Sequence, residues 1–502
     1  MKKEHLMKTL REPIRFLNRE EMETIHRNAL RILAEIGMKI DHDEALDYLQ
    51  AAGCKIDHCK KIVKFPSDVV QKFVDKMKSD FKSRNEPGKM AVRYSHVRFR
   101  RENFCVHEDF TASAGGFCVH IFDLHGIRRS GTLQDTRDSL KLVAQLDQIT
   151  YSGIPIAAQD IPVALRPITM AAELVKHTDK LGGIEAFNTF DIEYICRIAE
   201  VARGGREELK KNPILVGYAE ARTPLAIDRN MCEIMIEYIK RGMPQSLDTM
   251  PNAGATAPMN PAGALTLGIA ETLGGLVLGY TIDKDACMTI DVTPSFSDMG
   301  TGIFKYAGAE RAPLIGARIQ MISEYYGCPS GVHGGKTDTC VPDIRCGVEK
   351  AVSMIMPILC GAVGFGTLGQ LENGATFSPI QLVMDNEIVR YVRRAITGFE
   401  VTDKSINVDI IKEIGIGGNY LQTEDTLNQF REFLNLSPFF KVQPWGIRNE
   451  LDEVNRWERM AHKKTQELLK NEFMSPLNRD QILEIDKIVD EAAKKLHEQG
   501  QI

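Results

Sequence analysis

The chain has 502 residues, 63 of them basic and 68 acidic, with 43% hydrophobic and 26% charged side chains. These proportions are typical of a globular protein with a large core, and they exclude a disordered or fibrous chain. The net charge of −5 provides no broad cationic surface, so we expect no nucleic-acid partner.

The N-terminal stretch MKKEHLMKTLREPIRF has basic residues but no apolar segment followed by a small-residue cleavage site. It is not typical of a secretory signal, and we therefore expect a cytoplasmic protein. The eleven cysteines are odd in number and show no framework spacing, which favours a reducing compartment in which most of them are buried apolar side chains.

The first 85 residues are predicted to be helical. Asn18 and Glu21 have the spacing of a capping box, and apolar residues then recur every three or four positions. Two further helices are expected at 43–53 and from Ser67 onward.

Residues 90–130 are predicted to form hairpins. They alternate apolar and polar positions and are rich in aromatic and β-branched side chains. We expect them to be a separate β layer, so that residues 1–130 make an N-terminal unit of helices and hairpins.

From residue 131 to 430 a rhythm of helix, short apolar strand and loop repeats. Seven strands are expected, at 151–160, 182–187, 213–220, 244–249, 286–292, 327–335 and 362–370. Strands of this number with helical crossovers predict an α/β fold, a (β/α)8 barrel of the TIM type. The eighth strand is expected near 416–422, and an open doubly wound sheet is the alternative topology.

Residues 351–371 carry no charge over a length that could span a bilayer. Pro357 and four glycines divide this stretch into a short apolar helix and a short apolar strand, which favours a buried position. We therefore expect no membrane association.

Residues 431–502 are predicted as a helical tail. Its last helix places apolar side chains on one face, namely Ile482, Ile485, Val489, Ala492 and Leu496. Such helices act as clasps or subunit contacts, and we expect a homo-oligomer.

Active sites of barrels of this type form where the strands end, so polar residues that end the apolar runs are candidates. They are Asp160, Glu185, Glu220, Asp248, Asp291, His333 and Glu372. This set is rich in carboxylates, each of which is also an ordinary residue for a helix cap or a salt bridge.

The stretch GVHGGKTDTC, residues 331–340, surrounds His333 with glycines that would let a ligand approach the backbone closely. Lys336 in the same stretch could form a Schiff base if it were buried. The intervals from His333 to Cys340 and on to Cys346 do not match the close pairs of zinc sites, so no metal is expected. The glycines at 415–418 lack the GK[ST] of a phosphate-binding loop.

Aromatic side chains near the predicted strand ends could form a cage around a quaternary ammonium ion. Those at or just past strand ends are Phe187, Phe190, Phe365 and Phe377, and the β layer adds Tyr94 and Phe110. Each of them, taken singly, is more typical of the core.

Several stretches together resemble the trimethylamine methyltransferase family of corrinoid-dependent methyltransferases. They are IHRNALRILAEIGMKI, FDLHGIRRSGTLQDTRDSLKLVAQLDQI, NAGATAPMNPAGAL, GVHGGKTDTCVPDIRCGVEKA, FSPIQLVMDNEIVRYVRRAITGFEV and EIGIGGNYL. The resemblance covers nearly the whole length. Because the sequence contains only ordinary residues, it is similar to the members without pyrrolysine, which resemble demethylases of glycine betaine and other quaternary amines.

The resemblance implies a barrel enzyme that transfers a methyl group from a quaternary amine to a Co(I) corrinoid. The corrinoid is expected on a separate cognate protein, so that no cofactor is bound tightly by this chain. The sequence does not distinguish glycine betaine, carnitine, proline betaine and γ-butyrobetaine as substrates.

Under this hypothesis His333, Glu372 and Asp291 are the candidate catalytic residues. His333 would donate a hydrogen bond to a substrate carboxylate, Lys336 would add charge, and Asp291 or Glu372 would oppose the ammonium. The candidate substrate-binding residues are Tyr94, Phe187, His333, Lys336, Phe365 and Phe377. A lyase or aldolase that uses Lys336, and a non-catalytic protein that binds quaternary ammonium ligands, remain as alternatives.

Overall fold

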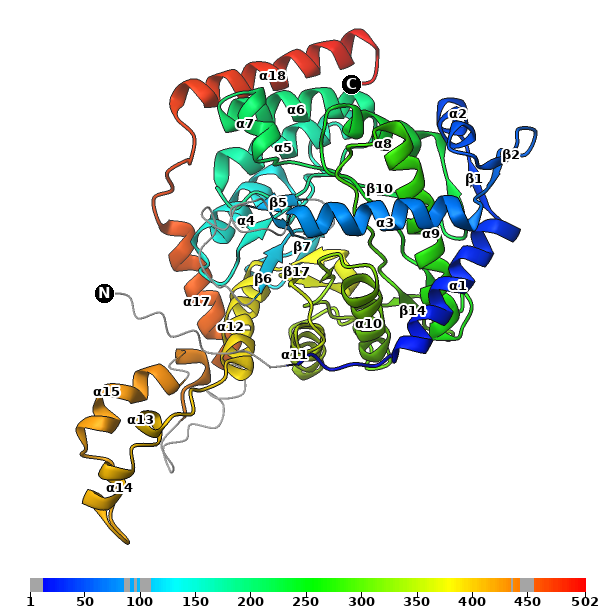
Figure 1. The fold of residues 1–502 in the computed structure, drawn as a ribbon. Coiled ribbons are helices and arrows are strands. Elements are labelled where there is room, and N and C mark those ends of the chain that lie inside the picture. Colours follow the sequence, from blue (N-terminus) through cyan, green and yellow to red (C-terminus); the bar gives the residue numbers. More distant parts are fainter. Residues whose placement is uncertain (1–11, 85–90, 94–96, 100–109, 435–436, 443–455) are drawn as a thin grey trace.

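The computed structural model describes residues 12–84, 91–93, 97–99, 110–434, 437–442 and 456–502. The fold is mixed α/β, with helices arranged around several short parallel sheets (Figure 1). Outside residues 399–434, the α-helices of the described residues are α1 (Arg19–Glu35), α2 (Asp43–Ala51), α3 (Ser67–Arg84), α4 (Leu133–Gln145), α5 (Arg166–His177), α6 (Thr189–Arg203), α7 (Arg206–Lys211), α8 (Arg229–Lys240), α9 (Pro261–Ile282), α10 (Arg311–Gln320), α11 (Ile344–Leu359), α12 (Pro379–Ile396), α17 (Arg456–Lys470) and α18 (Arg479–Glu498).

The strands are short. They are β1 (Met38–Ile40), β2 (Lys55–Asp57), β3 (Ile62–Lys64), β4 (Ala91–Arg93), β5 (Val97–Phe99), β6 (Thr111–Ala114), β7 (His120–Phe122), β8 (Arg128–Ser130), β9 (Tyr151–Ser152), β10 (Ala219–Glu220), β11 (Ala226–Ile227), β12 (Leu247–Asp248), β13 (Asn252–Ala253), β14 (Ser295–Ser297), β15 (Phe304–Lys305), β16 (Gly331–Val332), β17 (Gly364–Leu368), β18 (Gln370–Leu371) and β19 (Thr376–Phe377).

Parallel pairing links strands that are far apart in the sequence. One sheet has the order β16-β17-β6-β9, and β10 pairs in parallel with β12. Isolated parallel bridges add Ser152 to Leu181 and Gln245 to Met288. In each of these contacts except that of β6 with β17, the two paired segments come one after the other in the chain order of the parallel segments.

Arg318 of α10 lies where the segment 288–292 approaches β16. No ladder pair among the described residues joins these two segments. Instead, Arg318 forms an ion pair with Asp291 and donates to the carbonyl oxygens of Val292, at 2.8 Å, and Gly331. The described residues thus form several parallel sheets rather than one closed ladder, and the complete barrel stays a prediction.

The expected strand at 416–422 is wrong. Those residues form exposed turns between two short helices. The strand beside β17 is β6, which was expected in a separate β layer, so that expectation is wrong for β6. The hairpin β7-β8 is present. β6 is buried on both faces and therefore lacks the alternation by which the hairpins were recognised.

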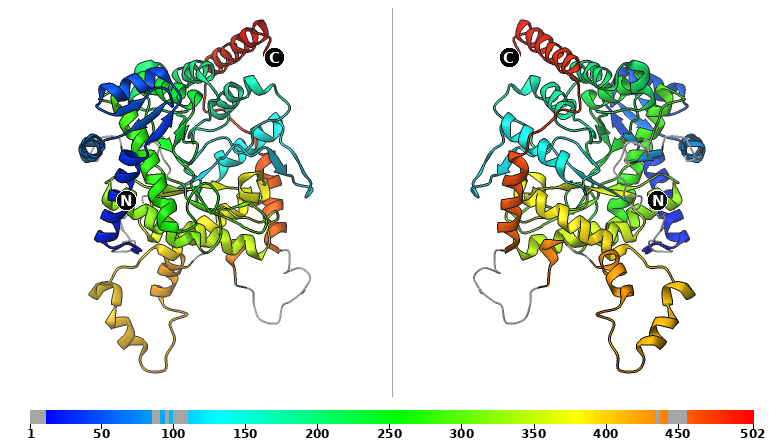
Figure 2. Two further views of the ribbon diagram at one scale, coloured as in Figure 1. Left: turned by 90° about the vertical axis from the view of Figure 1, so that its right-hand side faces the viewer. Right: turned by 90° about the vertical axis from the view of Figure 1, so that its left-hand side faces the viewer.

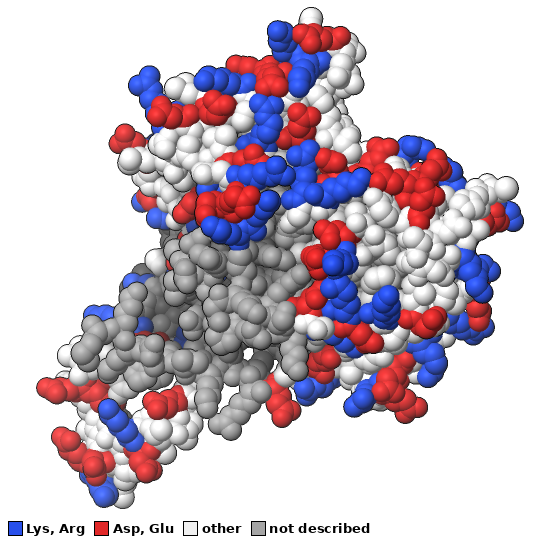
Figure 3. Space-filling model, turned by 45° about the horizontal axis from the view of Figure 1, so that its top comes forward, with Lys and Arg blue, Asp and Glu red and all other residues white. Residues whose placement is uncertain are grey.

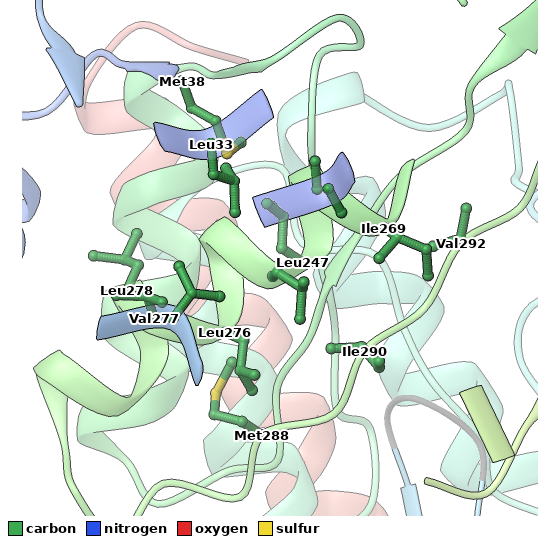
Figure 4. Close-up of a cluster of buried hydrophobic side chains, with 14 of the residues drawn as sticks. Leu33, Met38, Leu247, Ile269, Leu276, Val277, Leu278, Met288, Ile290 and Val292 are labelled. Atoms are coloured by element: carbon green, nitrogen blue, oxygen red, sulfur yellow. The ribbon is translucent and has the colours of Figure 1, made fainter. Parts of the chain in front are cut away.

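Helix α9 lies at the centre of one hydrophobic cluster, and Figure 4 shows side chains from α1, β1 and β12 around it. Its glycines allow this close packing: a Cβ on Gly275 would lie 2.2 Å from the Leu247 side chain. α9 is also the one described helix long and apolar enough to cross a membrane, but 83% of its apolar window is buried inside the protein. We interpret it as a core helix.

Several local predictions are confirmed. Asn18 and Glu21 form the capping box of α1, and the apolar stretch 351–371 folds into the end of α11 and the strand β17. The last helix, α18, buries Ile485, Ala492 and Leu496 on one face.

Candidate functional site

Three carboxylates come from neighbouring segments of the parallel array. Glu220 and Asp248 are register partners at the ends of β10 and β12, so their side chains lie on the same face. Tyr218 donates a hydrogen bond to Glu185 at 2.8 Å, and Ser246 donates one to Asp248 at 2.6 Å. These groups form the carboxylate side of the candidate site.

The electrostatics of this side favour a bound cation. Burial, reinforced by the charges of Asp248 and Glu185, raises the pKa of Glu220 to about 7. Burial also raises the pKa of Glu185. The carboxylates repel one another in a partly dry environment, and a positive ligand would relieve that repulsion.

Lys336 provides the opposite charge. Its side chain is buried, its Nζ lies 4.4 Å from the centre of the Tyr306 ring, and it donates to the Asn373 carbonyl at 3.3 Å. Burial, followed by the charge of Arg311, lowers the pKa of Lys336 to about 8. Within the described part of the chain no carboxylate forms an ion pair with Lys336, so this buried ammonium is suited to an anionic ligand.

The loop that carries Lys336 is held by a buried ion pair. Lys350 of α11 and Asp385 of α12 lie 2.8 Å apart, and both side chains are fully buried. Lys350 also donates to the Gly335 carbonyl at 2.7 Å, and Asp385 accepts from the Gly369 amide at 2.7 Å. This pair therefore ties together the chain segments that follow β16 and β17.

The Tyr306 ring contacts Lys336 and also lies within the electrostatic influence of Glu220. Burial raises the pKa of its phenol, while Arg311 lowers it and Glu220 raises it, so opposite charges act on the same ring. Arg311 fixes the surrounding backbone, because its guanidinium donates to the carbonyl oxygens of Tyr306, at 2.9 Å, and His333, at 3.2 Å.

His333 directly follows β16 and is only partly buried. It lines a small hollow of about 20 Å³ between α10 and α11, together with Tyr306, Arg311 and Met356. The structure thus places His333 beside Tyr306 and Arg311, and its role in substrate binding stays a prediction.

Two other predicted polar residues have different surroundings. Asp291 pairs with the buried Arg318. Glu372 accepts hydrogen bonds from Arg128 at 2.9 Å and Thr376 at 2.5 Å, and these bonds lower its pKa although burial opposes them. Both carboxylates therefore already have protein partners.

The predicted aromatic residues are not gathered around one hollow. Phe365 and Phe377 are fully buried in a hydrophobic cluster, where Phe365 packs against Phe110 with ring centres 5.2 Å apart. Phe187 is 37% exposed. Tyr94 lies outside the described residues. The roles given to these residues stay predictions.

Tyr306 and Arg311 were missed by reasoning from the sequence. Tyr306 follows β15, outside the predicted strands, and Arg311 begins α10. No spacing of apolar residues marks such positions. The carboxylates, in contrast, could be found because each ends a predicted apolar strand.

Comparison with known proteins gives consistent matches. Residues 2–497 match the family model described as trimethylamine methyltransferase (MTTB). The trimethylamine methyltransferase MttB of Methanosarcina barkeri strain Fusaro is 30% identical over 372 residues, which are 72% of this chain and 73% of that protein. The glycine betaine methyltransferase of Desulfitobacterium hafniense strain Y51 is 30% identical over 383 residues, 75% of this chain and 78% of that protein.

Proposed function

The chain belongs to the trimethylamine methyltransferase family, and we propose that it demethylates a quaternary amine of the betaine type. It is a methyltransferase that moves a methyl group from a methylated amine to a corrinoid protein. The partner's corrinoid supplies Co(I), the nucleophile that accepts the methyl group. We further propose that the protein acts in the cytoplasm.

The choice of a betaine rests on one observation: the candidate site has a positive charge on one side and negative charges on the other. Lys336 is a buried cation without an ion-pair partner in the described part of the chain, whereas Glu185, Glu220 and Asp248 form a group of buried or partly buried carboxylates. A betaine carries a carboxylate and a quaternary ammonium on one small molecule. It would satisfy both sides at once, whereas trimethylamine would leave Lys336 unpaired.

The residues would act by holding and orienting the substrate. A quaternary nitrogen has no lone pair, so no acid can activate it by protonation. The carboxylate side and the Tyr306 ring would hold the ammonium. Lys336 and His333 would bind the carboxylate, which leaves one methyl group directed outward. Such orientation can lower the activation free energy of a reaction by up to about 7–11 kcal/mol.

We propose that the parallel segments form one (β/α)8 barrel whose first strand is β6. The ladders, bridges and arginine contacts between successive segments from β6 to β17, together with the backbone hydrogen bond from Ile184 to Val216 at 3.4 Å, support this arrangement. In this barrel the catalytic unit would start before residue 131, the boundary expected from the sequence.

The corrinoid protein would dock on an exposed apolar surface beside the site. Met299, Ile303 and Phe304 are 42–73% exposed, and Ile344 and Val348 are 59–88% exposed. The first group borders the site, because the Asn373 side chain donates to the Phe304 carbonyl and the Asn373 carbonyl accepts from Lys336. The second group lies on α11, the helix that follows the loop of Lys336. Exposed apolar patches of this kind are typical of binding surfaces.

The test compares glycine betaine with choline, which has the same ammonium group but no carboxylate. We expect Lys336→Met to raise KM for glycine betaine by roughly 30-fold or more, since an ionic hydrogen bond is worth about 2 kcal/mol or more. KM for choline should stay within about twofold, because choline makes no contact that needs the ammonium of Lys336. Formation of methyl-Co(III) corrinoid, followed by absorbance, is the measurement.

The matched control is Lys240→Met, which removes an exposed lysine paired with Glu44 at 2.8 Å. It should leave both substrates unaffected. An equal loss for glycine betaine and choline in Lys336→Met would contradict the assigned role. Absence of methyl-Co(III) with every quaternary amine would overturn the function.

The lowered pKa of Lys336 also favours the second candidate, a lyase or aldolase with a Schiff base on this lysine. Borohydride reduction in the presence of a carbonyl substrate would then attach the substrate to Lys336. Mass spectrometry of the digested protein decides between the two functions.

A further inference from the structure

Residues 399–434 form an arm that projects from the body of the protein (Figures 1 and 2). It contains the helices α13 (Asp403–Ile406), α14 (Val408–Ile414) and α15 (Glu424–Phe433), and none of them has a buried residue. The barrel region expected from the sequence, residues 131–430, includes most of this arm.

The arm is rich in exposed apolar side chains. Of thirty-two large apolar residues that are exposed in the described chain, eleven lie in this short segment. They are Phe399, Val401, Ile406, Val408, Ile411, Ile416, Tyr420, Leu421, Leu427, Phe433 and Leu434. Figure 3 shows uncharged side chains between the charged ones on the arm, at the lower left. Such a density is typical of a surface that a partner covers.

The arm cannot be stable by its own local structure. Its helices have four, seven and ten residues, shorter than the roughly 12–15 residues that an isolated helix needs. Yet the sequence specifies them, because Thr402 forms a capping box and Thr423 caps α15. The missing stabilisation must come from another surface.

The tip of the arm presents apolar side chains outward. Ile416 is fully exposed between Gly415 and Gly417, whose φ angles of 70° and 78° favour glycine. Leu421 in the same loop is 85% exposed. Exposing this pair of apolar side chains to water is unfavourable, whereas burying them in an interface is favourable.

We infer that the arm is covered by a second copy of this chain. Full burial of a Val, Leu, Ile or Phe side chain removes roughly 60–120 Å² of apolar surface. With the exposed fractions observed, the arm offers on the order of 600 Å², close to the roughly 800 Å² per partner of a stable interface.

The exposed apolar side chains of the arm need a partner that stays bound, which favours a second copy of this chain over the corrinoid protein. This step rests on the proposed function. The corrinoid protein must leave after each methyl transfer, and its departure would expose the arm in every cycle. A second copy is present whenever the chain is made, and obligate interfaces are the more apolar ones.

The test measures the mass of the full chain in solution by size-exclusion chromatography with light scattering, without corrinoid protein. We expect an assembly at about 1 µM for the unchanged chain, and a dissociation constant at least about 100-fold higher for the variant Ile416→Asp/Leu421→Asp, since central apolar contacts dominate interfaces. Circular dichroism shows whether the body stays folded. The measured mass does not depend on methyl transfer, so this test is separate from the test of the proposed function.

The control is Met474→Asp/Leu483→Asp, which changes exposed apolar residues outside the arm, 85% and 48% exposed. It should assemble like the unchanged chain. A monomeric unchanged chain at about 50 µM, or an arm variant that assembles normally, overturns the inference. An arm variant that assembles normally but no longer binds the corrinoid protein assigns the arm to that partner instead.

Discussion

The carboxylate side and the lysine side of the candidate site are built in different ways. Glu220 and Asp248 end two paired strands, and the carboxylates Glu185 and Asp248 accept hydrogen bonds from neutral hydroxyl groups. Lys336 lies in an irregular loop that a buried ion pair anchors. Backbone pairing therefore positions the carboxylate side, whereas side-chain contacts from distant helices position the lysine side.

The largest expected effect comes from breaking the anchor of the lysine side. Lys350→Met leaves Asp385 buried without a counter-charge, so the free energy of unfolding should fall by about 3–5 kcal/mol. Urea denaturation followed by circular dichroism measures it.

Arg390→Met is the control for this change, because the Arg390 and Asp147 side chains are 37% and 57% exposed. It should alter the free energy of unfolding by about 1 kcal/mol at most. A Lys350→Met variant as stable as this control would show that the buried pair does not anchor the loop.

A change on the carboxylate side should affect all quaternary amines alike. Glu220→Gln keeps the shape of the side chain but removes a charge that would face the ammonium. We expect kcat/KM to fall by about 10- to 100-fold for both glycine betaine and choline. Glu193→Gln, at the exposed surface of α6, is the control. A loss confined to glycine betaine would place the ammonium elsewhere.

The smallest expected effect is on the pH dependence of kcat/KM, which should distinguish the carboxylate side from the lysine side. The ionised form of Glu220 is needed, so kcat/KM should rise with pH through about 7. The protonated form of Lys336 is needed only for a carboxylate, so kcat/KM for glycine betaine should fall above about 8, by about tenfold per pH unit. Choline should show the rise without this fall, and a fall with choline as well would remove Lys336 from carboxylate binding.

The sequence alone determined the α/β rhythm, the capping box at Asn18, the division of the stretch 351–371 and the carboxylates at the strand ends. These features depend on local periodicity and on residues close in the chain, which a single sequence displays. The family resemblance, confirmed over residues 2–497, added the reaction class.

Only the tertiary structure decided the remaining features. Pairing of β6 with β17 joins residues about 250 positions apart, and Tyr306 meets Lys336 through a loop without periodicity. The arm at 399–434 has an apolar pattern like that of a buried segment, and only its position in the fold showed that the chain leaves it exposed. Long-range contacts of this kind depend on how whole elements pack, and no local pattern encodes them.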